Sequence, residues 1–302
     1  MAKYPPAQAR YFSEGNGTQY EGFVAGNVRH MFNEPLQIFF EQGLIGLLLF
    51  LLILGWAMRI KKPEKGETGI FHSAKASILG IFVFSLFSYP FYSVPICVVF
   101  AVSLGILSGF EKPLRFANTP TVKYFIIAVV LLIAIHIVSV LPRLKKSYWL
   151  WDEANALYTM NSYKEANKSF QEAYSLYLDH NGIFLLNYAK SLYLSEDYNK
   201  ALEMLTEGKQ YYTDEVYFTT LGDTYKALEE YQKAEKAYLQ AANLVPHKFY
   251  PFYLLAKLYD HTGNKKEVLQ TVNQIMNKKV KVHSPAIEQI KEEMKQLKKK
   301  YQ

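Results

Sequence analysis

Long runs of uncharged apolar residues are the feature that most constrains this chain. They all lie between about Leu44 and Leu141, whereas residues 144–302 contain no such run and are rich in Lys, Glu, Tyr and Ala. A helix that crosses a bilayer needs about 20 predominantly apolar residues. The sequence therefore predicts a membrane region followed by a region that folds in water.

The first predicted span covers residues 35–58. Pro35 suits the first turn of a helix, because its missing N–H would be unpaired there anyway, and Asn33 is a plausible cap. Glu41 is the charged residue within this span, and Gly43 and Gly46 would let another helix approach closely. These features indicate a helix inside a bundle rather than a solitary anchor.

Three further spans are predicted, at about residues 76–89, 94–110 and 122–141. The uncharged stretch from Ala76 to Phe110 is too long for one ordinary span, and Pro90 and Pro95 interrupt it near its middle. We therefore expect two short spans joined by a tight turn.

Basic loops predict the orientation of these spans. Two of the predicted connections are flanked by basic residues: Arg59, Lys61, Lys62, Lys65 and Lys75 at the first, and Lys112, Arg115 and Lys123 at the second. This pattern places both connections in the cytoplasm and therefore requires an even number of spans between them. Residues 1–34 would then form an extracytoplasmic loop, and everything after Leu141 would lie on the same outer side. Basic residues at 143, 145 and 146 argue against this orientation, but large domains can translocate regardless of flanking charge.

The region after the last span is periodic. Residues 221–246 resemble a tetratricopeptide (TPR) repeat, a pair of antiparallel helices with small residues where they touch. The predicted contact positions are Ala166, Ala201, Ala234 and Val268, which are 35, 33 and 34 residues apart. Four repeats are expected to start near 147, 182, 215 and 249, with a polar terminal helix at 286–300 closing the stack. The predicted fold class is all-α, a polytopic helical membrane domain followed by a TPR solenoid over 147–302.

The formal charge of +7 does not by itself indicate a nucleic-acid ligand. Residues 278–302 contain eight Lys and three Glu, and we interpret this tail as a solvated cap. The single Cys97 cannot form an intramolecular disulfide, and no His has an Asp, Glu or Cys partner at ligand spacing, so neither a metal nor another cofactor is predicted. Most of the 24 tyrosines are expected to pack within the repeats rather than to stack on sugars.

The stretch from His30 to Gly46 resembles the late periplasmic loop and following helix of the bacterial O-antigen ligase and polymerase family. The pattern of that family is approximately His-x-His-Asn-x-x-Leu-Gln-x-x-x-Glu-x-Gly-x-x-Gly, and Phe32 stands in place of its second His. The "SYPF" turn at residues 88–91 is also similar to members of the family, some of which carry a periplasmic TPR tail. The resemblance covers residues 1 to about 141 and implies a bacterial inner-membrane protein with its N-terminal loop and TPR domain in the periplasm.

The resemblance implies a metal-independent glycosyltransferase. Such an enzyme moves a glycan from a polyprenyl diphosphate carrier to a sugar hydroxyl, for example of a lipid A core. His30 would take the hydroxyl proton, because a neutral imidazole can act as a base near pH 7. Arg29 and Arg10 are the local candidates for binding the diphosphate, and Asn33 and Glu41 for binding substrate, although helix capping and pairing with loop groups explain the latter two equally well.

Three functional hypotheses follow from the sequence. Members of the family have ten or more spans, so this chain would be the C-terminal part of such an enzyme and inactive alone. The second hypothesis is a non-catalytic, membrane-anchored TPR scaffold that recruits envelope proteins. The third is an assembly factor that docks on a complete ligase. All three predict contact with membrane lipid and a protein partner for the repeats, and none predicts nucleic acid.

Overall fold

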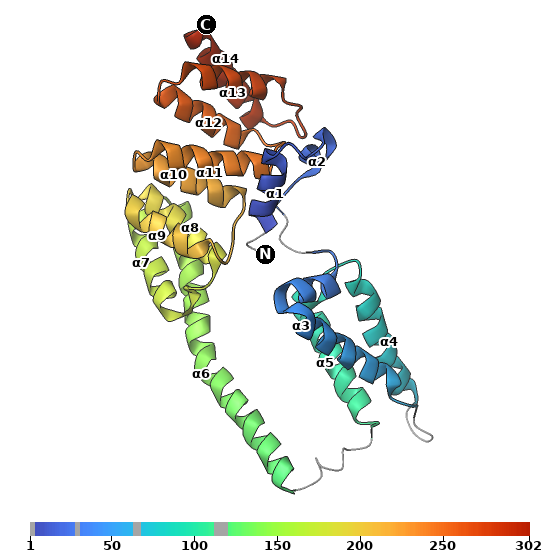
Figure 1. Cartoon of the computed structure of the whole chain (residues 1–302). Helices are drawn as coiled ribbons and strands as arrows, with labels where there is room; N and C mark the ends of the chain where they lie inside the picture. Colours follow the sequence, from blue (N-terminus) through green and yellow to red (C-terminus); the bar gives the residue numbers. More distant parts are fainter. Residues whose placement is uncertain (1–3, 28–30, 63–67, 112–119) are drawn as a thin grey trace. The chain divides into compact units, whose positions relative to one another are not determined.

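The computed structural model describes residues 4–27, 31–62, 68–111 and 120–302. It divides into two compact units, one formed by Met1–Asn27 with Ile137–Gln302 and the other by Val28–His136. Every regular element in the described part of the chain is a helix, which confirms the predicted all-α fold class (Figure 1).

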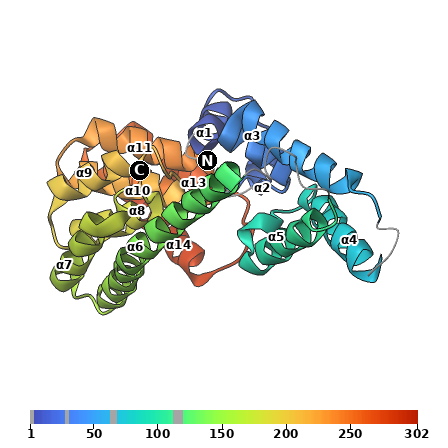
Figure 2. The ribbon, with the colours of Figure 1, turned by 90° about the horizontal axis from the view of Figure 1, so that it is seen from below.

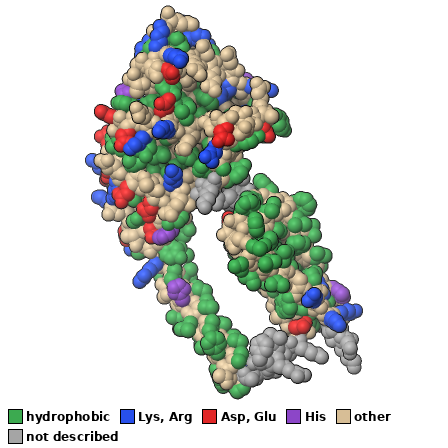
Figure 3. Space-filling view, in the orientation of Figure 1, with side chains coloured by type: hydrophobic (Ala, Val, Ile, Leu, Met, Phe, Trp, Pro, Cys, Tyr) green, Lys and Arg blue, Asp and Glu red, His purple; other side chains and the backbone are tan. Residues whose placement is uncertain are grey.

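The unit of residues 28–136 contains the apolar helices α3 (Glu34–Arg59), α4 (Thr68–Ser85) and α5 (Val94–Ser108). A short 3-10 turn, η1 (Pro90–Tyr92), lies between α4 and α5, where the two prolines were expected to interrupt the chain. The three helices pack around Leu54, Ala57, Phe71, Ile78 and Leu107. Hydrophobic side chains cover the visible face of this unit in Figure 3, as expected for helices surrounded by lipid.

Helix α4 differs from the predicted span at 76–89. It begins eight residues earlier, so Lys75, which we had assigned to a loop, lies within the helix. The Lys75 ammonium donates hydrogen bonds to the carbonyls of Met58 (2.8 Å) and Ile60 (2.7 Å). The helix ends earlier because Tyr89 precedes a proline and residues in that position are disfavoured in a helix.

Gly43 does not provide the close helix contact that we expected. Its φ of 72° is left-handed and breaks the regularity of α3, and an added Cβ would meet no atom within 4 Å. Glycine adopts this conformation at little cost, so the residue allows a kink rather than close packing.

Helix α6 (Pro120–Thr159) is a single 40-residue helix. The predicted last span, 122–141, forms its first half, and the helix continues through the predicted repeat start at 147. Leu150 and Ala154, in its second half, are buried in the core of the repeats. Three described helices, α3, α4 and α6, are long and apolar enough to cross a membrane, and α5 is a shorter apolar helix.

The remaining helices form the predicted stack of hairpins. After α6 come α7 (Tyr163–Ala173) with the π turn η3 (Tyr174–Leu178), α8 (Gly182–Leu194), α9 (Tyr198–Gly208), α10 (Glu215–Ala227), α11 (Tyr231–Leu244), α12 (Tyr250–His261), α13 (Lys265–Asn277) and the terminal α14 (Pro285–Tyr301). Figure 1 shows these helices stacked in chain order, and Figure 2 shows the same helices from below. The four predicted contact positions, Ala166, Ala201, Ala234 and Val268, are all fully buried.

The backbone shows the same period. Asn161, Glu196, Glu229 and Gly263 have left-handed φ values between 60° and 71°, and each lies in the turn between the two helices of a repeat. They are spaced 35, 33 and 34 residues apart, as are the contact positions. Tyr188, Tyr217 and Tyr238 are fully buried among the helices, so the prediction that tyrosines fill the repeat core is confirmed for these three.

Residues 4–27, called here the N-terminal segment, are not the loop that we predicted for 1–34. They form α1 (Tyr4–Ser13) and α2 (Gln19–Val24) and belong to the same compact unit as the repeats. Helix α1 lies against α11. Neither helix is long enough to show a clear apolar period, so tertiary packing rather than local pattern determines this part of the fold.

Candidate functional site

Two of the predicted catalytic and substrate-binding residues, His30 and Arg29, lie outside the described residues, and their roles stay predictions. Arg10 lies on α1, within the unit that contains the repeats, and its Nε is 3.5 Å from the Glu14 carboxylate one turn later. Both side chains of that pair are exposed to solvent. Such a pair contributes little to stability and leaves the guanidinium accessible.

Asn33 and Glu41 belong to a polar cluster at the start of α3. The Asn33 side chain caps the helix by accepting from the Leu36 N–H (2.9 Å), and its amide donates to the Leu86 carbonyl (3.0 Å). The buried amide of Gln37 donates to Glu41 (3.1 Å) and to the Tyr92 hydroxyl (2.8 Å). The cluster therefore ties the start of α3 to the turn at residues 86–92, and Gln37 and Tyr92 are members that the sequence analysis missed.

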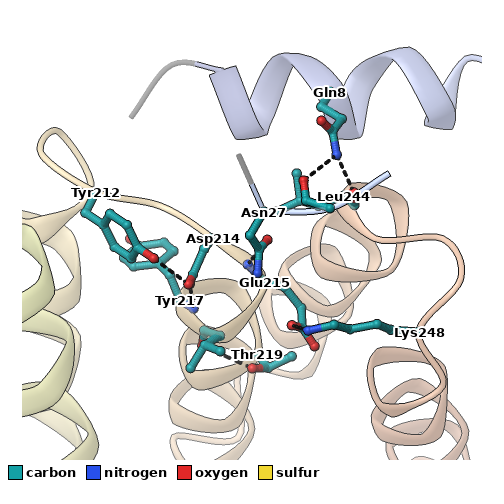
Figure 4. A network of polar contacts seen from close by, with 11 residues as sticks. Gln8, Asn27, Tyr212, Asp214, Glu215, Tyr217, Thr219, Leu244 and Lys248 are labelled. Atoms are coloured by element: carbon teal, nitrogen blue, oxygen red, sulfur yellow. Dashed lines mark hydrogen bonds and ion pairs between the residues drawn. The ribbon is translucent and has the colours of Figure 1, made fainter. Parts of the chain in front are cut away.

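A second polar network joins the N-terminal segment to the repeats (Figure 4). The Gln8 amide donates to the Leu244 carbonyl at the end of α11 (2.7 Å) and to the Gly26 carbonyl (3.3 Å). One residue further, Ala9 is 3% exposed and packs in the repeat core with Ala241 and Leu244. The segment thus contributes side chains to the core of the domain.

The end of the N-terminal segment contacts the start of α10. The side-chain carbonyl of Asn27 accepts from the Glu215 N–H (3.3 Å), and the buried Glu215 carboxylate is paired with Lys248. Asp214 caps the same helix by accepting from the Tyr217 N–H (2.7 Å), and it also accepts from the Tyr212 hydroxyl (2.7 Å). The first turn of α10 is therefore held from both sides (Figure 4).

A groove of about 1110 Å³ lies between the N-terminal segment and the last two repeats. Helices α11 and α13, the second helices of their repeats, contribute to its walls together with α12, and Phe12 and Phe23 contribute from the N-terminal segment. Apolar rings and aliphatic side chains alternate with amides around it; the latter include Gln19, Asn243, Gln270, Gln274 and Asn277. It is larger than the cavity beside Tyr148 and Tyr211 (about 570 Å³) and the one beside Tyr4 and Tyr11 (about 420 Å³).

Lys278 lines this groove immediately after α13. Its ammonium lies 3.5 Å from the centre of the Phe252 ring and donates to the Pro246 carbonyl. Burial lowers the pKa of Lys278 to about 8. No described carboxylate lies within ion-pairing distance, so a partly buried cation has carbonyl and aromatic partners but no counter-ion here.

His247 lies in the same groove. Burial lowers its pKa, and the nearby Lys281, Lys248 and Lys278 lower it further by charge repulsion. Its Nδ1 is buried without a hydrogen-bond partner among the described residues. The imidazole is therefore neutral at pH 7, and the positive charge of the groove comes from its lysines.

Neither the groove nor the polar cluster resembles a metal site. Across residues 4–27, 31–62, 68–111 and 120–302, no three His, Cys, Asp or Glu side chains come together in a way that could hold a metal ion. The side chains that line the groove include amides, aromatic rings, ammonium groups and the His247 imidazole, which bind ligands by hydrogen bonds, stacking and charge.

Comparisons with known proteins reveal a likeness only to solved structures. No protein-family profile matches the sequence, and no curated protein matches it. Solved structures that are similar include MamA (19% identity, TM-score 0.42, covering 52% of this chain and 86% of that one) and the first TPR of Spaghetti (RPAP3) bound to an HSP90 peptide (18% identity, TM-score 0.37, covering 39% and 94%).

One local sequence pattern could have predicted helix α2, whose residues line part of the groove. Thr18 and Glu21 form a capping box, in which the Thr18 hydroxyl accepts from the Glu21 N–H (3.2 Å) and the Glu21 carboxylate accepts from the Thr18 N–H (2.7 Å). The pattern Thr-x-x-Glu is a recognised start of a helix. The left-handed φ of Gly15 (74°) marks a turn before this helix, and the sequence analysis predicted a loop here rather than a helix.

Proposed function

We propose that this protein is a membrane-anchored helical-repeat scaffold that binds a partner protein through its TPR region. The observation that carries this proposal is the groove between the N-terminal segment and repeats three and four, which is large enough for several residues of a peptide and lined by amides and rings. Stacked helical repeats characteristically offer extended surfaces of this kind to other proteins. The apolar helices α3–α6 would hold that surface at the membrane.

The packing of the N-terminal segment supports a topology with both ends of the chain on one side of the membrane. Residues 4–27 precede the first apolar helix and the repeats follow the last, yet they share one core. An even number of crossings would therefore separate them, which favours counting α5 as a crossing together with α3, α4 and α6. Combined with the basic loops, this supports the periplasmic side of a bacterial inner membrane for both.

Site-specific photo-crosslinking in cells would test the scaffold function. A photoreactive amino acid at the exposed Gln270, in the groove, or at Lys190, on the repeats, should yield discrete protein adducts. The matched control is Ile45, 75% exposed on α3, where adducts should be with lipid. Equal protein adducts from Ile45 and the two repeat positions, or none from the repeats, would rule out a partner-binding role for the TPR region.

A second candidate is the glycosyltransferase function implied by the resemblance at His30–Gly46. What supports it is the polar cluster of Asn33, Gln37, Glu41 and Tyr92, in which the Gln37 amide is buried, because polar groups in membrane helices often belong to functional sites. The catalytic base would be His30. Loss of glycan transfer in membranes on His30→Ala, at unchanged protein level, would favour this candidate, whereas transfer that does not depend on His30 or on this chain would exclude it.

A further inference from the structure

Three lysines that follow α13 lie at the groove and contact its aromatic rings. Lys278 lies inside, against Phe252. The ammonium groups of Lys279 and Lys281 lie 5.3 and 5.4 Å from the centre of the same ring, that of Phe23 in the N-terminal segment. Lys281 also donates to the Phe23 carbonyl (2.9 Å). The solvated-cap interpretation is thus wrong for Lys278, whereas Lys279 and Lys281 are exposed beside the Phe23 ring.

These lysines leave positive charge unbalanced at one end of the groove. No ion pair joins any of the three to a carboxylate in the part of the chain that the structure describes, although other lysines of the repeats, such as Lys248 and Lys300, are paired. Glu267 is the acidic side chain among the residues that line the groove. Since a partly desolvated ammonium interacts more strongly with an anion than a fully hydrated one, the site is suited to a carboxylate.

The rest of the groove suits an extended peptide. Phe12, Leu239 and Leu255 offer apolar contacts, and the amides of Gln270 and Gln274, one turn apart on α13, can bind backbone N–H and C=O groups. A flat anionic surface such as a lipid bilayer would reach the exposed Lys279 and Lys281 but could not fill a walled groove or approach Lys278 beside the Phe252 ring.

We propose that this composite groove binds an extended acidic segment of a partner protein, with Lys278, Lys279 and Lys281 holding its carboxylates and the aromatic and amide walls holding its backbone and apolar side chains. The site is incomplete without the N-terminal segment, which supplies Phe12 and Phe23 from before the first membrane helix. The proposal rests on the scaffold function and adds the place and the chemistry of recognition. The groove lies on α11 and α13, the second helices of repeats three and four.

A peptide-display selection tests the proposal. The full chain, solubilised in detergent, is panned against a library of random decapeptides, and the selected peptides are measured against three variants. The first variant, Lys279→Met/Lys281→Met, removes two charges and retains side chains that can cover Phe23. The second, Lys278→Met, removes the partly buried charge. The control is Lys164→Ser/Lys168→Ser on α7, at sites far from the groove in sequence. We expect selected peptides to be enriched in Asp or Glu beside apolar residues, with affinity falling at least tenfold in Lys279→Met/Lys281→Met and unchanged in the control.

A second readout does not depend on the fold tolerating Lys278→Met. The imidazole of His247 lines the groove near Lys278 and Lys281, so its titration can be followed by NMR in the unsubstituted chain, with the signal assigned by its loss in His247→Gln. A carboxylate bound beside the lysines should raise the pKa of His247, because a nearby negative charge favours the protonated ring. The same peptide with Asn and Gln in place of Asp and Glu should leave that pKa unchanged. Enriched peptides without acidic residues, affinity that is equal in all variants, or no change at His247 would overturn the proposal.

The outcomes also separate this inference from the scaffold function. Protein crosslinks at Lys190, together with selected peptides that show no acidic preference, would support the scaffold function and contradict the acidic-peptide site. Flotation with vesicles containing anionic phosphatidylglycerol, lost in Lys279→Met/Lys281→Met while no peptide is selected, would assign the lysines to the membrane surface instead. Acidic peptides that bind in vitro without any adduct from the repeats in cells would contradict the scaffold function but not the chemistry of the groove.

Discussion

The side-chain amide of Gln8 lies 2.7 Å from the backbone carbonyl of Leu244, although 236 residues separate them in the sequence. One of them precedes the first apolar helix of the chain and the other follows the last. A hydrogen bond cannot form across a bilayer whose hydrocarbon core is about 30 Å thick. When the apolar helices cross a membrane, this contact therefore requires the two residues to be on the same side.

Cysteine accessibility should show this topology directly. In a Cys97→Ser background, we expect Ser13→Cys and Lys266→Cys to react with the same membrane-impermeant thiol reagent in intact cells, whereas Lys62→Cys should react only after the membrane is opened. Opposite labelling of positions 13 and 266 would mean that the N-terminal segment cannot dock on the repeats in the cell.

Gly222→Ala should destabilise the third repeat. A Cβ at this position would lie 2.3 Å from the Tyr238 ring, which is itself 1% exposed and cannot move freely. Overpacking of this kind typically costs about 1–3 kcal/mol. Thermal unfolding of the full chain in detergent measures the effect, and Gly26→Ala, where an added Cβ meets no atom within 4 Å, is the control that should stay within about 0.5 kcal/mol of the unsubstituted protein.

Tyr238→Phe should destabilise the protein in a pH-dependent way. The Tyr238 hydroxyl donates to the Asp223 carboxylate (2.6 Å), whose pKa is raised by burial. Without the hydroxyl, the buried carboxylate loses this partner, at a cost of about 1–3 kcal/mol at pH 7. The cost should shrink as the pH falls through the raised pKa of Asp223, because a neutral carboxylic acid depends less on a hydrogen-bond donor than a buried carboxylate does. Tyr20→Phe, at a position 75% exposed, should show neither effect. A cost that is independent of pH would mean that Asp223 does not titrate in the folded protein.

Deprotonation of Lys278 should make the fold more stable at alkaline pH than at neutral pH. Burial lowers its pKa to about 8 in the folded chain, so between pH 8 and its ordinary value of 10.5 the unfolded chain binds more protons than the folded one. The free energy of unfolding should rise with pH across this window, although ionising tyrosines oppose the rise near its upper end. His247, Lys248 and Lys281 also surround the site, so the comparison must be made against Lys278→Met, in which this increment should be missing. Hydrogen exchange of α13 across the lower part of this window would measure the difference, and parallel pH profiles for the two proteins would show that Lys278 titrates normally.

The repeats could be predicted from the sequence because their signal is local and periodic. Ala166, Ala201 and Ala234 recur at nearly constant spacing, and each contacts residues of its own or the adjacent hairpin. The cap at Asn33 was likewise predictable, since its partner Leu36 is three residues away.

The groove could not be predicted in the same way. Phe23 and Lys281 are 258 residues apart, and nothing in either local sequence indicates that they meet. A run of lysines near the end of a chain has the composition of a solvated tail whether or not aromatic rings cover it. Contacts formed only in the folded protein determine the surroundings of such residues, so composition alone did not reveal that Lys278 lies against Phe252.

The place of Ala9 in the repeat core also sets an order of events during synthesis. At a typical rate of about 5–20 residues per second, roughly 10–50 s pass between the emergence of Gln8 and that of Leu244 from the ribosome. Throughout that time α1 does not yet have α11 to pack on. Helix α1 is therefore made long before it can reach its final position, and until it does, the end of α11 stays uncovered and open to chaperones or to other chains.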